Sequence, residues 1–151
     1  MQLFYQKLTP EAYPPEQGYD GDLGFDIRTP TAFVIPAGQG IVVDTRLRIQ
    51  LPALPKAFQA DFVLGCFVWS KSGLSVKSNI EKGAGVIDPN YTGELKIKLY
   101  NHGDIDRAFD AGDKIAQLVM MVCARLHGSQ EVDLSEWETA RGQQGFGSSG
   151  R

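Results

Sequence analysis

The stretch Ile41-Val42-Val43-Asp44-Thr45-Arg46-Leu47-Arg48-Ile49 indicates the fold class of this chain. Within it, positions 43, 45, 47 and 49 carry apolar or small side chains, whereas positions 44, 46 and 48 carry charged ones. Because successive side chains of a β-strand point to opposite faces of the sheet, this alternation predicts a strand with one buried face. Residues 94–100 repeat the pattern, with leucine or isoleucine at 95, 97 and 99, and predict a second strand of the same kind.

Residues that favour turns separate the apolar runs along the chain. Many short strands divided by Gly, Pro, Asn and Asp predict an all-β fold, either a sandwich or a barrel. The turn segments are Pro36-Ala37-Gly38, Pro52-Ala53-Leu54-Pro55, residues 88–93, Asn101-His102-Gly103-Asp104 and Ala111-Gly112-Asp113.

Three further segments complete the expected organisation of the fold. Residues 114–126 are apolar on both faces, which predicts a central strand that enters a subunit interface, although a short apolar run also fits a buried helix. Residues 51–67 hold two prolines and then an aromatic run, and we expect a loop that leads into a strand. Residues 71–79 predict a short helix.

The bulk composition is that of a single folded domain of 151 residues, with 42% hydrophobic and 22% charged residues. A formal net charge of −3 gives no general attraction to nucleic acid or to an anionic membrane, so we expect neither as a partner. The N-terminal sequence lacks a secretion signal, and no run reaches the roughly 18 apolar residues of a membrane span. We therefore expect a cytoplasmic protein, or a nuclear or host-cell protein if the source is eukaryotic or viral.

The cysteines and histidines form no spacing typical of a metal or redox site. We expect Cys66 and Cys123 to be buried, reduced and apolar in character. We expect His102 and His127 to lie at the surface or at strand ends.

The last residues differ in composition from the rest of the chain. We assign residues 1–139 to a β-domain and residues 140–151, ARGQQGFGSSGR, to a tail that is mobile unless a ligand orders it. An unstructured terminus is the simpler interpretation. The tail also has the chemistry of a nucleotide clamp, because Arg141 offers a planar fork to phosphate, Ser148 and Ser149 add hydroxyl donors, and Phe146 offers a flat face to a base.

Two internal segments could contact an anion. Lys71-Ser72-Gly73 combines a cation, a hydroxyl and an open backbone at the start of a predicted helix, and a plain helix cap is the alternative. Residues 85–93 predict a hairpin in which Asp88 ends a buried apolar pair. A role for that carboxylate in capping the turn is the alternative.

The order and spacing of five short motifs resemble the trimeric dUTP diphosphatases. The motifs extend over nearly the whole chain and occur in the family's order. They are Asp22-Leu23-Gly24-Phe25-Asp26-Ile27-Arg28, Lys71-Ser72-Gly73-Leu74-Ser75, Gly85-Val86-Ile87-Asp88-Pro89-Asn90-Tyr91-Thr92-Gly93, Gly112-Asp113-Lys114-Ile115-Ala116-Gln117-Leu118 and residues 141–150.

The resemblance implies a jelly-roll-like β-barrel of the β-clip type, assembled as a homotrimer in which each C-terminal tail closes a neighbouring active site. It also implies hydrolysis of dUTP to dUMP and pyrophosphate, which limits uracil in DNA and supplies dUMP for dTTP synthesis.

The family's substrate contacts would fall on the following residues of this chain. Uracil would be read mainly by the backbone of the third motif, at Gly85, Val86 and Ile87, with Lys96 on the next strand. Tyr91 would pack on the deoxyribose and exclude a ribose.

The resemblance also implies roles around the triphosphate. Asp88 would deprotonate the water that attacks the α-phosphorus, and Asp26 would bind Mg²⁺ through water ligands. Gln117 would position the phosphates or that water. The remaining substrate contacts would be Lys71, Ser72 and Gly73 on the phosphates, Phe146 over the uracil, and Arg141, Gly147, Ser148 and Ser149 on the γ-phosphate.

The chain departs from the family pattern at three places. Lys71 replaces the usual arginine and keeps its charge without the planar fork, and Ser149 stands where threonine is common. Residues 52–67 make a longer connection than in compact members. We expect an extra surface loop there, and a binding element for a regulatory protein is the alternative.

Two other functions fit the sequence less well. The related dCTP deaminases carry a catalytic glutamate on the strand after the hairpin, where this chain has Lys96, Ile97 and Lys98. A regulatory nucleotide-binding protein is the second alternative, although Asp26, Asp88 and the other site residues are all retained.

Overall fold

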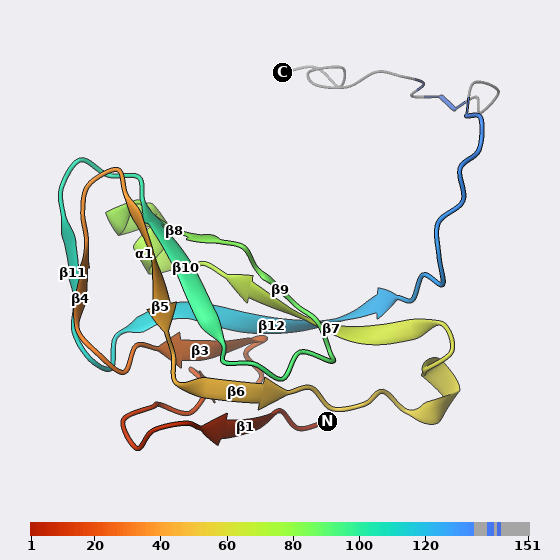
Figure 1. Cartoon of the computed structure of the whole chain (residues 1–151), viewed down its shortest axis with the longest axis horizontal. Helices are drawn as coiled ribbons and strands as arrows, with labels where there is room; N and C mark the ends of the chain where they lie inside the picture. Colours follow the sequence, from red (N-terminus) through yellow and green to blue (C-terminus); the bar gives the residue numbers. More distant parts are fainter. Residues whose placement is uncertain (135–138, 141, 143–151) are drawn as a thin grey trace.

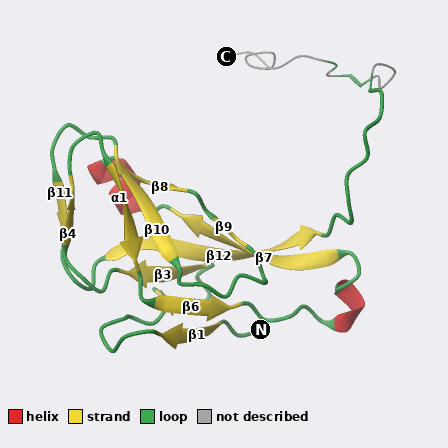
Figure 2. Cartoon of the chain, in the orientation of Figure 1, coloured by secondary structure: helices red, strands yellow, loops and turns green. Residues whose placement is uncertain are grey.

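The computed structural model describes residues 1–134, 139, 140 and 142. Within these residues the regular secondary structure is almost entirely β-strand, with one short α-helix and one 3-10 turn (Figure 2), as the sequence predicts. The elements are β1 Phe4–Lys7, β2 Glu16–Gln17, β3 Gly24–Arg28, β4 Phe33–Ile35, β5 Gly40–Asp44, β6 Leu47–Gln50, η1 Lys56–Phe58, β7 Phe62–Trp69, α1 Ser72–Ser78, β8 Ile80–Gly83, β9 Val86–Ile87, β10 Lys96–Asn101, β11 Arg107–Phe109 and β12 Lys114–Ala124.

The strands form antiparallel sheets, which Figure 1 shows crossing one another at steep angles. The largest sheet has the order β2-β3-β12-β7-β9, and a three-stranded sheet has the order β5-β10-β8. Two small ribbons, β1-β6 and β11-β4, lie at the periphery. Strand pairing among the described residues therefore gives separate sheets and not one closed ring.

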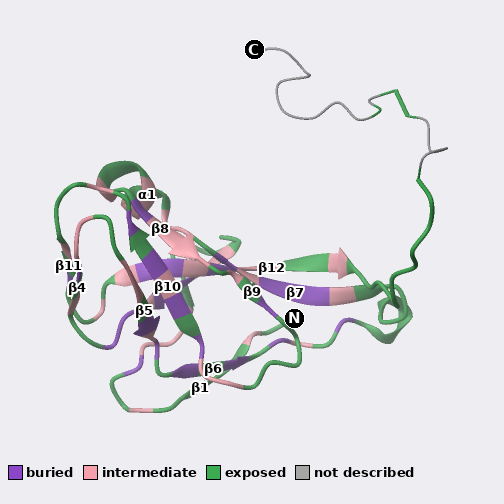
Figure 3. Ribbon diagram, turned by 45° about the horizontal axis from the view of Figure 1, so that its top comes forward, coloured by how far each residue is buried: buried purple, intermediate pink, exposed green. Residues whose placement is uncertain are grey.

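The core lies between these sheets and draws on both of the larger ones. Cys66 and Leu118 from the five-stranded sheet are fully buried, and Ile97 and Leu99 from the three-stranded sheet are 1% exposed. Figure 3 shows that the buried residues are concentrated where β7, β12 and β10 cross. Burial of these side chains is the main source of stability in a domain of this size.

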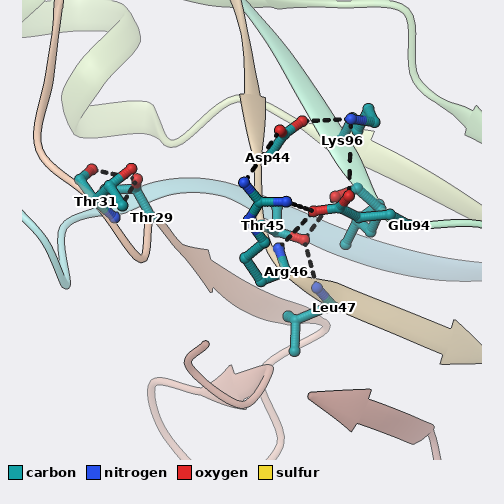
Figure 4. A network of polar contacts seen from close by, with 9 residues as sticks. Thr29, Thr31, Asp44, Thr45, Arg46, Leu47, Glu94 and Lys96 are labelled. Carbon is teal, nitrogen blue, oxygen red and sulfur yellow. Dashed lines mark hydrogen bonds and ion pairs between the residues drawn. The ribbon is translucent and has the colours of Figure 1, made fainter. Parts of the chain in front are cut away.

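The predicted strand at residues 41–49 is interrupted at Arg46, which adopts a left-handed backbone with φ of 57°. The chain changes sheets there, from β5 beside β10 to β6 beside β1. The buried Thr45 hydroxyl donates to the Leu95 carbonyl at 2.6 Å and accepts from the Leu47 amide at 3.2 Å (Figure 4). Val43, Thr45, Leu47 and Ile49 are all buried as the alternation predicts, but the expectation of one continuous strand was wrong.

The other predicted elements are confirmed, with one partial exception. β10 buries Ile97 and Leu99, residues 51–61 form a loop that leads into β7, and α1 occupies the expected place. β12 is the central strand of its sheet, so the helical alternative is wrong. Only the first half of β12 is largely buried, because Met121 is 39% and Val122 56% exposed in its second half.

The third motif does not form the expected hairpin. β9 pairs with β7, whereas β10 pairs with β5 and β8, so the two limbs of the motif belong to different sheets. The loop between β9 and β10 consequently bridges the two larger sheets. This difference matters for the site, because a pocket lies between residues 83–88 of one limb and residues 94–98 of the other.

The single-residue predictions are largely confirmed. Both cysteines are free thiols; Cys66 is buried, whereas Cys123 is only half-buried. Burial raises the pKa of the Cys66 thiol to about 11. His102 and His127 are exposed. Among the described residues, no helix has the length and apolar character needed to span a membrane.

The left-handed backbone at Arg46 gives a test of the junction between sheets. Glycine tolerates this conformation without steric cost, so Arg46→Gly should have a free energy of unfolding about 1 kcal/mol higher than Arg46→Ala. Both variants lose the same guanidinium, and urea denaturation compares them directly. At Arg48, which lies in extended β6, the order should reverse. A more stable alanine variant at position 46 would contradict this account of the junction.

Candidate functional site

A buried carboxylate, Asp26, lies at the centre of the first cluster of predicted site residues. Its side chain is only 5% exposed, and both of its oxygens are engaged by lysines. Lys71 contacts Oδ1, and Lys114 contacts Oδ2 at 2.6 Å. Burial alone would raise the pKa of Asp26, but the hydrogen bonds from Lys114 and Lys71 together hold that pKa below its usual range. Asp26 is therefore a carboxylate at neutral pH.

A β-bulge in β12 brings Lys114 and Gln117 to the same face as Asp26. Gln117 stands opposite Asp26 in the register with β3, and Lys114 stands opposite Arg28. In a regular strand, residues 114 and 117 would point to opposite faces. One extra residue between Lys114 and Ala116 shifts the register, so both side chains reach the Asp26 side while Ile115 and Ala116 are buried.

Hydrogen bonds hold the second motif against this cluster. Gln117 Nε2 donates to the Ser70 carbonyl at 3.1 Å. The Ser70 hydroxyl donates to Glu81 at 2.5 Å, and the Ser75 hydroxyl of α1 donates to the other oxygen of the same carboxylate. These bonds from Ser70 and Ser75 lower the pKa of Glu81. Glu81 on β8 thereby fixes the direction of α1, which begins directly after Lys71.

The third motif lines a separate pocket of about 200 Å³. Its wall is formed by residues 83–88 on one side and residues 94–98 on the other, with Tyr91 between them. Asp88 follows β9 directly and accepts the Tyr91 amide through its backbone carbonyl at 3.0 Å. The Tyr91 hydroxyl donates to the Glu94 carbonyl at 2.9 Å, which fixes the ring although the residue is 47% exposed.

Two consecutive residues with positive φ shape the entrance to this pocket. Ala84 has φ of 57° and Gly85 has φ of 148°. A Cβ atom at position 85 would come within 2.9 Å of Lys82 Nζ. The backbone carbonyl of Gly85 accepts a hydrogen bond from the Val68 amide at 2.7 Å. Glycine adopts positive φ without steric cost, so Ala84 is the strained residue of the pair, and strain of this kind is concentrated at functional sites.

The far side of the pocket is fixed by a network of charges (Figure 4). Lys96 Nζ contacts Asp44 at 2.5 Å and Glu94 at 3.7 Å. The hydrogen bond to Asp44 raises the pKa of Lys96 and lowers that of Asp44. Arg46 completes the network, with its amide on Glu94 at 2.9 Å. Lys96 lines the pocket, but its ammonium group is already engaged by two carboxylates.

The predicted site residues therefore fall into two groups in the described part of the chain. Asp26, Lys71 and Gln117 lie together, with Ser72 and Gly73 exposed at the start of α1. Gly85, Val86, Ile87, Asp88, Tyr91 and Lys96 line the pocket. In the part of the chain that the structure describes, no hydrogen bond, ion pair or pocket joins one group to the other. Arg141, Phe146, Gly147, Ser148 and Ser149 lie outside the described residues.

The donor set near Asp26 fits a magnesium ion held through water better than one held directly. Among the described residues, no group of three or more His, Cys, Asp or Glu side chains is arranged to hold a metal ion. Mg²⁺ commonly keeps several water ligands and uses one or two carboxylates with substrate phosphates. The one ionised carboxylate here, Asp26, would meet that requirement together with the phosphates of a bound nucleotide.

Sequence reasoning missed two residues that build the site. Lys114 lies within the fourth motif, but its part in neutralising Asp26 depends on a bulge that periodicity does not reveal. Glu81 lies outside all five motifs and accepts hydrogen bonds from Ser70, before α1, and from Ser75, within it. Neither has a local sequence signal that distinguishes it from an exposed charged residue.

Comparison with known proteins gives matches over nearly the whole chain. The family model described as dUTPase matches residues 11–150. The probable deoxyuridine 5′-triphosphate nucleotidohydrolase of Schizosaccharomyces pombe is 34% identical over 153 residues, covering 99% of each chain. The deoxyuridine 5′-triphosphate nucleotidohydrolase of Saccharomyces cerevisiae is 37% identical over 151 residues, covering 98% of this chain and 94% of that protein.

Solved structures agree at the level of the fold. The dUTPase of Staphylococcus bacteriophage 80alpha with dUpNHpp has a TM-score of 0.82 at 24% identity and covers 99% of each chain. A mutant dUTPase of phage phi11 of S. aureus, for which the coordination of a structural Mg(II) ion is described, has a TM-score of 0.73 at 22% identity and covers 89% of this chain and 99% of that chain. With the family model and the full-length relatives, the conclusion is direct: the chain belongs to the dUTPase family and is a dUTP diphosphatase.

Proposed function

We propose that the chain hydrolyses dUTP to dUMP and pyrophosphate by attack of water on the α-phosphorus, with Asp88 as the general base and Mg²⁺ on the phosphates. The observation that carries the proposal is the position of Asp88, at the wall of a pocket lined by residues 83–88 and 94–98. A carboxylate at the wall of a base-sized pocket lies near the first phosphate of a nucleotide whose base fills it. Such a group can accept the proton of a water within hydrogen-bond reach.

The edge of β9 gives the pocket a way to select uracil. β9 is the last strand of its sheet, so the outer backbone groups of Val86 and Ile87 are not paired with another described strand. An edge of this kind offers alternating donors and acceptors, and a base with the wrong pattern leaves buried polar groups unpaired. Gly85 keeps the backbone close to the base, and the fixed ring of Tyr91 packs on the deoxyribose.

The phosphates are assigned to the Asp26 cluster and the start of α1. Lys71 supplies charge, and the exposed backbone at Ser72 and Gly73 supplies amide donors. Gln117, held by the Ser70 carbonyl, positions the phosphates or the attacking water. Bound Mg²⁺ supplies positive charge to the triphosphate, and Asp26 holds it through water ligands.

The separation of the two groups supports an active site assembled from several chains. A second copy of the chain can bring the Asp26 cluster of one subunit to the Asp88 pocket of another. Exposed apolar side chains at Leu23, Val86 and Val122, between 56% and 80% exposed, provide surface for such contacts. We infer a homotrimer of jelly-roll-like barrels, as in the family.

The segment after β12 supports exchange of the tail between subunits. Residues 125–134 extend away from the body of the chain (Figure 1). Leu126 is 86%, Val132 50% and Leu134 56% exposed, which is unfavourable unless another surface covers them. We infer that residues 140–151 form a separate tail that closes a neighbouring site, with Phe146 on the base and Arg141, Gly147, Ser148 and Ser149 on the γ-phosphate.

The cellular assignments complete the proposal. Hydrolysis of dUTP limits uracil in DNA and supplies dUMP for dTTP synthesis, in a cytoplasmic, nuclear or host-cell location. The structure corrects the expected surface loop at residues 52–67, because residues 62–67 belong to β7 and only residues 52–61 form a connection. This connection and the start of β7 expose Phe58 and Phe62, whose ring centroids lie 6.4 Å apart. This aromatic pair is the natural contact if a regulatory protein binds there.

The proposed function is tested by supplying dUTP, dCTP, dTTP and UTP with Mg²⁺ and measuring pyrophosphate and ammonia. Release of pyrophosphate from dUTP alone is expected. Release of ammonia from dCTP would indicate a deaminase, and binding of dUTP without turnover would indicate a regulatory protein.

Asp88→Asn should bind dUTP normally and lower kcat by about 10²- to 10⁴-fold, because asparagine cannot accept the proton. Equilibrium binding of dUpNHpp and steady-state turnover separate the two effects. Asp104→Asn, at an exposed turn away from the pocket, is the matched control. Near-normal turnover in Asp88→Asn would remove this residue from the general-base role.

Deletion of residues 141–151 should leave the trimer intact and lower kcat/KM by roughly 10²-fold, because an open site admits water and loses phosphate contacts. Sedimentation measures the assembly and pyrophosphate release measures the rate. A Gly/Ser tail of the same length should be as impaired as the deletion. An unchanged rate would show that the tail takes no part in catalysis.

The lowered pKa of Asp26 predicts how its contribution to stability depends on pH. The contribution is fully present above the pKa of an unfolded aspartate and is lost as the pH falls through the lower pKa of the folded state. The difference in free energy of unfolding between wild type and Asp26→Asn should therefore be largest near neutral pH and decrease in acid. Urea titrations across this range measure it, and a constant difference would mean that Asp26 is not charged in the fold.

A further inference from the structure

Lys82 lies against the turn that shapes the entrance to the Asp88 pocket. This turn, made by Ala84 and Gly85, joins β8 to β9 and carries the chain from the three-stranded to the five-stranded sheet (Figure 1). The Lys82 ammonium donates a hydrogen bond to the Ala84 carbonyl at 3.1 Å. Lys82 Nζ also lies 2.9 Å from the place that a Cβ atom of residue 85 would occupy. The lysine side chain therefore packs along the backbone of the turn.

The ammonium reaches the turn from the side that faces away from the Asp88 pocket. Lys82 lines a second cavity of about 150 Å³ together with Phe67 and Trp69, and none of these three residues lines the Asp88 pocket. Val68 and residues 84–86 line both cavities. The turn is therefore the partition between the two cavities, and Lys82 stands behind it.

Hydrogen bonds fix the point from which the Lys82 side chain starts. The Lys82 amide donates to the Ser70 hydroxyl at 3.0 Å, and that hydroxyl donates to Glu81 at 2.5 Å. Lys82 also stands opposite the buried Leu99 in the register of β8 with β10. Among the described residues, no carboxylate forms an ion pair with Lys82, so the ammonium is not drawn away from the turn.

The turn needs such a contact because part of its backbone is unfavourable. Ala84 has a left-handed φ of 57°, which a residue with a Cβ atom adopts at a cost in free energy. The Gly85 carbonyl is held by the Val68 amide at 2.7 Å. Within the described part of the chain, the Ala84 carbonyl accepts a hydrogen bond from Lys82 alone. Loss of this bond would let the strained residue return toward an ordinary backbone conformation.

The peptide group between Ala84 and Gly85 links this contact to recognition of the base. In a trans peptide the carbonyl and the following amide lie in one plane and point in opposite directions. A carbonyl held on the Lys82 side therefore directs the Gly85 amide toward the other face of the turn, which lines the Asp88 pocket. The Gly85 amide donates to no acceptor among the residues that the structure describes, so it can donate to a ligand.

We propose that Lys82 is a positioning residue for recognition of uracil. Its ammonium holds the Ala84–Gly85 peptide in the orientation in which the Gly85 amide meets an acceptor oxygen of the base. The inference rests on the proposed function, in which the Asp88 pocket binds uracil. Asp88 follows β9, whose register is fixed by pairing with β7 and not by Lys82. Removal of the ammonium therefore weakens binding of the base and leaves the chemical step unchanged.

The test compares variants of the full-length protein by steady-state turnover of dUTP and by equilibrium binding of dUpNHpp. Lys82→Met should raise KM and weaken dUpNHpp binding by about 5- to 20-fold, the effect of one hydrogen bond from a charged group, while kcat stays within about twofold. Lys82→Arg should recover much of the affinity, because a guanidinium can donate to the same carbonyl. Lys56→Met, which removes an exposed lysine in η1, should match wild type.

A second pair of variants tests whether Lys82 acts through the turn. Ala84→Gly removes the steric cost of the left-handed backbone, so the turn keeps its conformation with less help from the ammonium. Lys82→Met should therefore weaken dUpNHpp binding less in the Ala84→Gly protein than in wild type. An equal loss of affinity in the two backgrounds would overturn the proposal.

Pyrophosphate, which lacks a base, separates recognition of uracil from a general disturbance of the site. Its inhibition constant should be the same for wild type and Lys82→Met, and thermal unfolding checks that each variant is folded at the assay temperature. Equal weakening of pyrophosphate and dUpNHpp, or unchanged affinity for dUpNHpp, would contradict the role of Lys82. Wild-type protein that binds dUpNHpp without turning over dUTP would contradict the proposed function instead, and the binding comparison would still test Lys82.

Discussion

The site depends on keeping one carboxylate charged where water hardly reaches it. Asp26 is 5% exposed, and burial of an isolated carboxylate would drive it toward the neutral form. Two lysines offset that cost, one directly before α1 and one from the start of β12. The charge requirement therefore ties three segments together: β3, the entry to α1 and the bulge of β12. This arrangement leaves cations and an ionised acid beside the backbone that is assigned to phosphate.

The second constraint is the junction at Thr45 and Arg46. The chain must leave one sheet and enter another there without exposing buried backbone groups, and the Thr45 hydroxyl and the Leu95 backbone satisfy them. The same contacts fix residues 94–96, which form one wall of the pocket. The contacts that let the chain pass from one sheet to the other therefore also position one wall of the pocket. Ion pairs at the surface also orient the side chains at this junction, namely those of Asp44, Arg46, Glu94 and Lys96. Each exposed ion pair contributes little to stability by itself.

Much of the fold could be predicted because burial follows simple periodicity. The inward positions 43, 45, 47 and 49, the strand at β10 and the helix at α1 were all identified correctly. The predictions of a continuous strand across Arg46 and of a hairpin at residues 85–93 were wrong for the same reason. Alternation records which face a side chain occupies, but it does not record which strand is the neighbour.

The candidate site was predictable only as a set of residue types. The motifs supplied Asp26, Lys71, Asp88, Tyr91 and Gln117, but not the grouping of these residues into two places within one chain. Lys114 and Glu81 were not identified, because neither a bulge nor a carboxylate that bonds two nearby serines has a pattern that distinguishes it from an exposed charged residue. The sequence by itself determined the β-character, the buried faces and the family, since these depend on local periodicity and motif order. Only the tertiary structure decided which charges neutralise one another and where backbone edges remain unpaired, because both depend on contacts between residues far apart in the chain.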